Sequence, residues 1–540
     1  MARDENTRRP VGYAALIEQL GLALPTPHHV SSIGPGARER QATAGGVHES
    51  FPEQFARSDV IDHLVFALKY DGVDLLVLRA AFEAIGPDDL TRAIRKRPTS
   101  TYLRRLWFFY EWLLGYRLEI DDARSGAYVN ALEPDEYVTR AGEKLRRYRV
   151  NFNLLGVSSD WCPMVRRTDT IKSYEGEGLE ALARAAVSNL PPRDLQRAVR
   201  YLYTKETRAS FEIERAAPTE RMERFVEALF SQAGEATPVW WDIDTLIEVA
   251  EVIISDPRFA PKGLRGSEVR VSEQRILSGR ERVHYVAPRH KDLPRLMDAF
   301  VEAWRSHHLV ELPRPVAGSI VGADERPYAI QRSCGLPWVD FVVAGCLSFG
   351  FVFLHPFEDG NGRLHRLILH RVLSATGFTP RGMVIPISAA ILHDQTGYDA
   401  ALEDSSRRIM PFVEYSIDSQ DGSMNVSNET AHLYRYPDLT VAIESLCRWF
   451  EAAVKTELVQ ELELLRAMDA AKSGMREVVE LPDQREDLFL RLVVQSQRDG
   501  RGFTLSKAKR SKLFADLADD EIVRLQQIIQ DAFREAKGLA

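Results

Sequence analysis

Apolar residues recur three and four positions apart along most of the chain, which is the spacing of amphipathic helices. The pattern predicts helices over 60–70, 75–85 and 101–118, each bounded by residues that break a helix. Residues 341–354 differ because they read FVVAGCLSFGFVFL, fourteen residues without a charge. A run of this length is too short to span a bilayer and is typical of a helix buried on all sides. We predict that it is the central helix of a domain.

The pattern divides the chain into four parts. Residues 1–55 are rich in Pro, Gly, Ser and charge, so we expect an irregular N-terminal segment. Helical patterns fill 56–185 and 426–540, which predicts an N-terminal and a C-terminal helical domain. Between them, 186–425 is also mainly helical, but β-branched and polar residues interleave near 270–288. That interleaving predicts a small β-hairpin flap within a mainly α fold.

Composition and charge narrow the class of protein. At 540 residues, with 45% hydrophobic and 27% charged residues, the chain is expected to form two to four ordinary globular domains. A net charge of −8 argues against wholesale binding to nucleic acid or membranes, and the basic 507–512 is explained by a solvated turn. Four cysteines without a CxxC pair argue against a zinc site or a disulfide framework. The first ten residues lack the apolar stretch of a signal peptide, so we expect a cytoplasmic protein.

The most informative stretch directly follows the charge-free run and reads HPFEDGNGRLHR, residues 355–366. Gly360 and Gly362 allow a sharp turn and a close approach of the backbone to a ligand. A second helix is predicted to begin at this turn, and its free N–H groups form an anion site suited to phosphate. Arg363 and Arg366 are three positions apart and project from the same face. Two guanidinium groups over a helix N-terminus indicate a polyphosphate ligand.

Two further side chains of this stretch add acid–base and metal chemistry. The Asp359 carboxylate would repel a phosphate unless Mg²⁺ lies between them. His355, at the end of the first helix, supplies a group that accepts a proton near neutral pH. Any one of these residues would pass for a loop cap or a surface charge. Packing alone does not explain all of them within twelve residues after a buried helix.

The stretch resembles the signature of Fic-domain proteins, His-x-Phe-x-(Asp/Glu)-Gly-Asn-Gly-Arg-x-x-Arg, and every fixed position is filled. A looser similarity extends over about 190–420. The resemblance implies nucleotidyl transfer, usually of AMP from ATP to a protein hydroxyl. It implies that His355 takes the proton of the attacking hydroxyl and that Asp359 holds Mg²⁺ against the phosphates. Asn361 and the backbone of 360–363 would cradle those phosphates.

The same resemblance assigns further roles. Arg363 would pair with the leaving pyrophosphate and Arg366 with the γ-phosphate, while Phe357 would fix the loop from the core. The flap would align a target segment by strand-like pairing. Tyr398 lies in YDAAL, which follows the signature in the family's order, and it either lines the adenine pocket or is a core tyrosine. Both glycines are present, which favours AMP transfer over the kinase activity of some family members.

A second match lies at 210–215, SFEIER, on a helix expected near 204–216. Many Fic proteins carry an inhibitory helix with the pattern (Ser/Thr)-x-x-x-Glu-(Gly/Asn), which Ser210 and Glu214 fit and Arg215 does not. The match implies a salt bridge from Glu214 to Arg366 that blocks the seat of the γ-phosphate. In some relatives the same glutamate helps water to remove AMP from a modified target.

Three functions therefore stay open. The first is an AMP transferase held down by its own Glu214, and the second is a hydrolase that removes AMP at the same site. The third is a regulatory protein whose core senses a nucleotide, which the intact His355 argues against. ATP and a protein target are the expected partners. The identity of that target and the formation of a homo-oligomer are left open.

Overall fold

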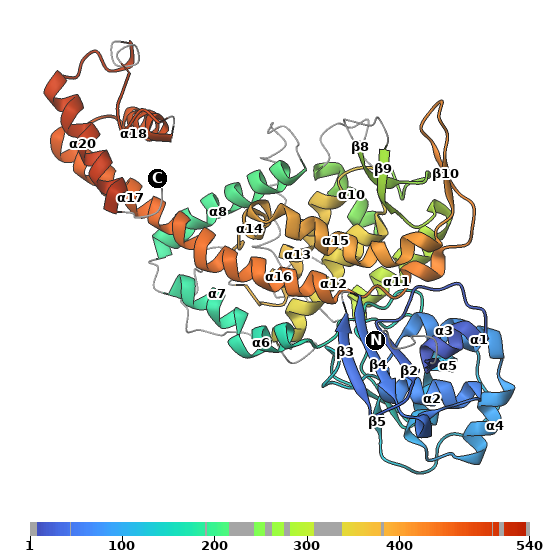
Figure 1. Ribbon diagram of the computed structural model, residues 1–540. Helices are drawn as coiled ribbons and strands as arrows, with labels where there is room; N and C mark the ends of the chain where they lie inside the picture. Colours follow the sequence, from blue (N-terminus) through green and yellow to red (C-terminus); the bar gives the residue numbers. More distant parts are fainter. Residues whose placement is uncertain are drawn as a thin grey trace, which may run out of the picture.

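The computed structural model describes residues 8–43, 45–188, 192–214, 242–253, 262–274, 281–306, 337–379, 383–498, 500–506 and 512–535. In these residues the chain is mainly helical, with small sheets of two to four strands (Figure 1). The predicted fold class is therefore confirmed. Short 3₁₀ turns connect several elements: η2 Glu53–Phe55, η3 His290–Asp292, η4 Met410–Phe412 and η5 Ala431–Tyr434.

The N-terminal segment that we expected to be irregular contains a four-stranded mixed sheet. Its strands follow the order β1-β2-β4-β3, with β2 and β4 parallel and the other pairs antiparallel. Val11, Ile33, Phe51 and Phe66 close a small core beneath it. The expectation was wrong because the strands are short and mostly polar, so they resemble loop sequence. The elements are β1 Arg9–Val11, α1 Tyr13–Gln19, β2 His29–Ile33, β3 Glu39–Thr43 and β4 Gly46–Phe51.

The predicted helices of the N-terminal part are present and share one hydrophobic core. Asp59 and Asp74 cap α2 and α3 by accepting hydrogen bonds from backbone N–H groups, and left-handed Gly115 ends α5. A three-stranded sheet also packs against α5. We had predicted a helical domain here, so this part contains more β-structure than expected. The elements are α2 Val60–Tyr70, α3 Leu75–Ile85, α4 Asp88–Lys96, α5 Thr101–Leu114, β5 Val129–Asn130, β6 Glu143–Leu145 and β7 Val150–Phe152.

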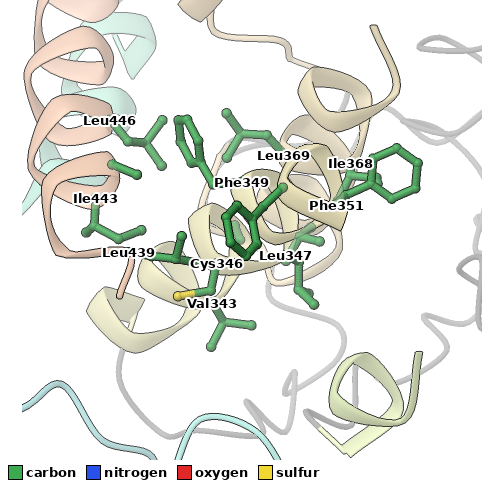
Figure 2. Packing of buried hydrophobic residues seen from close by; sticks show 14 of the residues in the cluster. Val343, Cys346, Leu347, Phe349, Phe351, Ile368, Leu369, Leu439, Ile443 and Leu446 are labelled. Atoms are coloured by element: carbon green, nitrogen blue, oxygen red, sulfur yellow. The ribbon is translucent and has the colours of Figure 1, made fainter. Parts of the chain in front are cut away.

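The central part is built around α12, Pro337–Leu354, which contains the charge-free run. Among the described residues α12 is the one helix long and apolar enough to cross a membrane, but 83% of it is buried within the protein. It packs along α13, Asn361–Ala375, and against α16, Thr440–Ala452 (Figure 2). A Cβ at Gly345 would lie 2.4 Å from Ile443, so the absent side chain admits α16 at close range. The predicted central helix is confirmed.

Further helices surround this pair and complete the largest core of the molecule. They are α6 Asp169–Glu177, α7 Leu179–Ser188, α8 Pro192–Ile213, α10 Ile243–Ile253, α11 Leu293–Ser306, α14 Ile387–His393 and α15 Gln395–Ile409. The helix expected near 204–216 is thus the second half of α8, followed by Glu214, whereas 215 and 216 lie outside the described residues.

Two antiparallel hairpins lie at one end of the central part (Figure 1). β8, Arg270–Gln274, pairs with β9, Glu281–Val286, so the flap predicted near 270–288 is a hairpin, and its connection at 275–280 lies outside the described residues. β10, Tyr415–Ile417, pairs with β11, Met424–Val426. The Arg270 guanidinium donates to the Gly422 carbonyl at 3.0 Å, which joins the two hairpins.

The C-terminal helices extend away from the body of the molecule (Figure 1). α16 continues through a π-helical stretch, Ala453–Leu458, into α17, Val459–Val478. The second half of α17 forms a separate core with α18, Asp483–Arg498, and α20, Asp519–Glu535. Residues 426–465 instead pack with the central core, whereas we expected the C-terminal domain to start at 426. The separate C-terminal core begins only in the second half of α17. An amphipathic pattern does not reveal which core a continuous helix joins.

Candidate active site

A preformed turn connects α12 to α13. Both ends of the Asn361 side-chain amide bind the backbone of Phe357: Nδ2 donates to the carbonyl at 2.7 Å, and Oδ1 accepts from the N–H at 3.1 Å. Gly360 has a φ of 81°, which favours glycine, and Phe357 is fully buried as predicted. We expected Asn361 to contact phosphates. Its buried amide is used on the turn instead, so its contribution is to hold the loop's shape.

Arg265 holds the same turn from outside. Its Nε donates to the His355 carbonyl at 2.9 Å and its backbone N–H to the Pro356 carbonyl at 2.9 Å. Its other guanidinium nitrogens donate to the carbonyls of Ser267 and Pro288, at the two ends of the flap. The side chain is buried. Arg265 therefore ties the flap to the backbone of the candidate base, a role that sequence reasoning missed.

His355 directly follows α12 and has a φ of 49°, which is uncommon for a residue with a side chain. Its Nδ1 lies 3.3 Å from the Val352 carbonyl, which only accepts, so Nδ1 carries the hydrogen and Nε2 the lone pair. Burial lowers the pKa of His355 to about 4, and the charge of Arg265 acts in the same direction. The ring is thus neutral at pH 7 and able to accept a proton.

Arg363 and Arg366 project from the first turns of α13 and meet the same carboxylate. Glu214 Oε1 lies 2.8 Å from Arg366 Nη2, and Glu214 Oε2 lies 2.7 Å from Arg363 Nε. The arginine side chains are nearly buried, with 7% and 1% exposed, while 22% of the Glu214 side chain is exposed. The predicted contact between Glu214 and Arg366 is present. The contact with Arg363 was not foreseen.

The start of α13 leaves room for this carboxylate. A Cβ at Gly362 would lie 2.4 Å from Glu214 Oε1, closer than real Cβ contacts come. Gly362 is therefore the position at which a helix backbone and an anionic oxygen approach each other. Arg215, the residue that departs from the inhibitory pattern, lies outside the described residues.

Three polar residues spaced four apart contact α13, and we call them the polar seam: Glu206 and Ser210 of α8, and Glu214, which directly follows it. Ser210 receives two hydrogen bonds from Arg366, at 2.8 Å to its hydroxyl and 2.9 Å to its carbonyl. Fully buried Glu206 accepts from His370 Nε2 at 2.7 Å and from the Ser388 N–H at 2.8 Å. Sequence reasoning missed Glu206, although its spacing from Ser210 and Glu214 was a usable signal.

Tyr398 is buried next to Arg366. Its hydroxyl is 2.7 Å from His365 Nε2 and 3.5 Å from Arg366 Nη1, and the side chain is buried. Of the two readings of this residue, the structure favours the core tyrosine over the adenine-pocket residue.

Asp359 is the residue expected to hold a metal. Its side chain is 58% exposed, lies 3.3 Å from Arg363 Nη2 and accepts from the Gly360 N–H at 2.6 Å. No group of three or more His, Cys, Asp or Glu that could hold a metal occurs among the described residues. One exposed carboxylate suits Mg²⁺, which keeps several waters and binds mainly through substrate phosphates.

Comparison with known proteins finds similarity to one family over part of the chain. Residues 240–373 match the model of the Fic/DOC family. The protein adenylyltransferases fic-1 of Caenorhabditis briggsae and Caenorhabditis elegans are 30% identical over 119 residues and 31% identical over 93 residues. These matches cover 19% and 16% of this chain, and only 22% and 17% of the two relatives. A Fido domain-containing protein of Dictyostelium discoideum is 32% identical over 95 residues, which are 18% of this chain and 59% of that protein.

Two solved structures are also similar. A Fic domain containing signaling protein from Bacteroides thetaiotaomicron has a TM-score of 0.33 and 16% identity, covering 55% of this chain and 97% of that one. A Fic family protein from Desulfovibrio desulfuricans has a TM-score of 0.32 and 18% identity, covering 68% of this chain and 87% of that one.

Proposed function

We propose that this chain, which carries a Fic/DOC family domain and is distantly related to protein adenylyltransferases, transfers AMP from ATP to a Ser, Thr or Tyr hydroxyl of a protein. One observation supports the proposal: two nearly buried arginines and the start of α13 converge on a single carboxylate, and the neutral His355 begins the turn that leads into the same helix. A place that holds one anionic group between two guanidinium groups is suited to the phosphates of a nucleotide.

The residues would divide the chemistry as follows. His355 Nε2 takes the proton of the target hydroxyl as its oxygen attacks the α-phosphorus, and the bond from that phosphorus to the pyrophosphate oxygen breaks. Arg363 and Arg366 stabilise the charge that develops on the departing pyrophosphate. Asp359 would hold Mg²⁺, which neutralises phosphate charge when it is bound. The protein contributes position and charge, and it forms no bond to the substrate.

Glu214 would act as an inhibitor of this reaction. It occupies the two guanidinium groups that the phosphates need, and its oxygen lies against Gly362 at the start of α13. ATP would then bind only by displacing Glu214 or with its phosphates in an unproductive position. The parent protein should accordingly be nearly inactive in isolation.

Incubation with α-labelled ATP, Mg²⁺ and a cell lysate tests the proposal, with the parent compared to Glu214→Gly. Label on protein, stronger in the variant, supports AMP transfer. Release of AMP from a modified target, without labelling, would instead support the hydrolase. Bound ATP with neither activity would support a nucleotide sensor, and both of these results would overturn the proposal.

A further inference from the structure

Arg366 is held almost entirely by the helix that would have to release it. In the described part of the chain its guanidinium makes three hydrogen bonds to Ser210 and Glu214, which belong to α8 and the residue after it. A fourth, from Nη1 to the Tyr398 hydroxyl, is long at 3.5 Å. Tyr398 lies on α15, so this contact does not depend on α8. When Glu214 leaves, Ser210 and Tyr398 remain as partners of the guanidinium, and of these two Tyr398 is the one outside α8.

The proton on the Tyr398 hydroxyl can be located from its neighbours. Ser348 Oγ lies 2.7 Å from the His365 carbonyl and 2.9 Å from His365 Nδ1. The carbonyl only accepts, so it takes the single hydroxyl proton of Ser348, and Nδ1 must be the donor to Oγ. Burial lowers the pKa of His365 well below its ordinary value, so the ring is neutral and Nε2 keeps a lone pair.

Nε2 of His365 lies 2.7 Å from the Tyr398 oxygen, which therefore donates to it. Burial also raises the pKa of Tyr398, so the hydroxyl keeps its proton. With that proton directed at His365, the oxygen presents only lone pairs toward Arg366. The chain of donors runs in one direction, from Arg366 to Tyr398, His365, Ser348 and back to the backbone of α13.

We infer that Tyr398, oriented by His365 and Ser348, is a positioning residue that keeps Arg366 aimed at the γ-phosphate of ATP once Glu214 has left. The inference rests on the proposed function, because that function gives Arg366 its role. With Glu214 in place, Ser210 and Glu214 accept hydrogen bonds from the Arg366 guanidinium and hold it on the side of α8. This accounts for the long distance of 3.5 Å between Arg366 Nη1 and the Tyr398 hydroxyl. Without the Glu214 carboxylate, a loosely held guanidinium would lose more side-chain entropy on binding phosphate than one oriented from a second side by Tyr398.

The test uses the full chain with Glu214→Gly, to which Tyr398→Phe is added. Calorimetry with Mg²⁺ compares ATP with ADP, which lacks the γ-phosphate. We expect the Kd of ATP to rise about tenfold, because one hydrogen bond to a charged group is lost, while the Kd of ADP stays within about twofold. Tyr137→Phe is the matched control, since Tyr137 is also buried and its hydroxyl binds the backbone of Val73 in the N-terminal core. It should change neither value.

An equal loss of affinity for both nucleotides would show a general loosening of the core, and no loss would show that Arg366 needs no such partner. Either result overturns the inference. If the Glu214→Gly protein binds no ATP, this inference and the proposed function both fail. If it binds ATP but labels no protein, transfer fails alone, and the ratio of the two Kd values still decides the role of Tyr398.

A second measurement needs no variant to fold. Histidine labelled with ¹⁵N should show His365 in the neutral form with hydrogen on Nδ1 throughout the range from about pH 6 to pH 8. Hydrogen on Nε2, or a charged ring, would reverse the direction of the Tyr398 proton and overturn the inference.

Discussion

The exchange of Glu214 for glycine tests the site most directly, because one carboxylate contacts both arginines that we propose to bind phosphate. Its oxygens lie 2.8 Å from Arg366 and 2.7 Å from Arg363, and both guanidinium groups are nearly buried. A hydrogen bond to a charged group contributes about 1.5–3 kcal/mol. Glu214 accepts one such bond, from Arg366, and forms an ion pair with Arg363, so displacing it costs ATP about 3 kcal/mol and the substitution should raise apparent ATP affinity on the order of 100-fold.

The assay is the initial rate of auto-labelling from α-labelled ATP, with ATP affinity measured by calorimetry on the same preparations. Glu212→Gly is the matched control, since Glu212 is an exposed residue of α8 where glycine costs the helix about 1 kcal/mol, at least as much as at position 214, which follows the helix. Arg366→Ala should not imitate Glu214→Gly, because it also removes the group that seats the γ-phosphate. The reasoning is refuted if the Glu214 and Glu212 variants bind ATP and label equally while both remain folded.

Three further predictions concern the base and the metal. His355→Ala should lower transfer ~10²–10⁴-fold while the calorimetric Kd for ATP stays unchanged, because the imidazole meets the hydroxyl and not the phosphates; labelling at the parent rate would assign the base elsewhere. Asp359→Ala should abolish the Mg²⁺ dependence of ATP binding, measured with and without the metal, and an unchanged dependence would point to neighbouring Glu358 or to no metal role. Because burial lowers the pKa of His355 to about 4, the ring stays neutral as pH falls through 6.5, so kcat/KM of Glu214→Gly should be flat between about pH 6 and pH 8. A loss centred near pH 6.5 that disappears in His355→Ala would contradict the assignment.

Local patterns in the sequence were sufficient to predict the central helix, the flap and part of the candidate site. A charge-free run predicted α12, and the interleaved residues near 270–288 predicted the β8–β9 hairpin, because both signals lie within one element. The contact between Glu214 and Arg366 was also foreseen, since a separate motif marked each partner.

The N-terminal sheet was not foreseen because its pairing is non-local. β2 pairs in parallel with β4, although β3 lies between them in the sequence. β3 is exposed along its whole length, so no alternation of apolar and polar residues marks it as a strand. Pro- and Gly-rich connections made the segment resemble a disordered one. Strand order of this kind depends on contacts that a window of sequence does not contain.

The positioning residues were missed for a related reason. Arg265 binds a carbonyl 90 residues away, and Glu206 binds a histidine 164 residues away. Because every residue has a backbone carbonyl, the sequence does not indicate which carbonyl a distant arginine will bind. We predicted Asn361 and Tyr398 as site residues from the sequence. Their side chains bind buried partners, the Phe357 backbone and His365, and the motif alone did not indicate these contacts.

The polar seam is anchored unevenly, and this bears on how the protein can respond to a nucleotide. Glu206 is fully buried between α13 and α14, and the adjacent Lys205 lies 3.0 Å from Glu457. Glu214, in contrast, follows the last helical residue and is partly exposed. The middle of the helix is therefore anchored more firmly than its end, and local opening at a helix end needs little free energy. We expect the closed and open forms to differ by about one helical turn, so that they interconvert without any domain changing place.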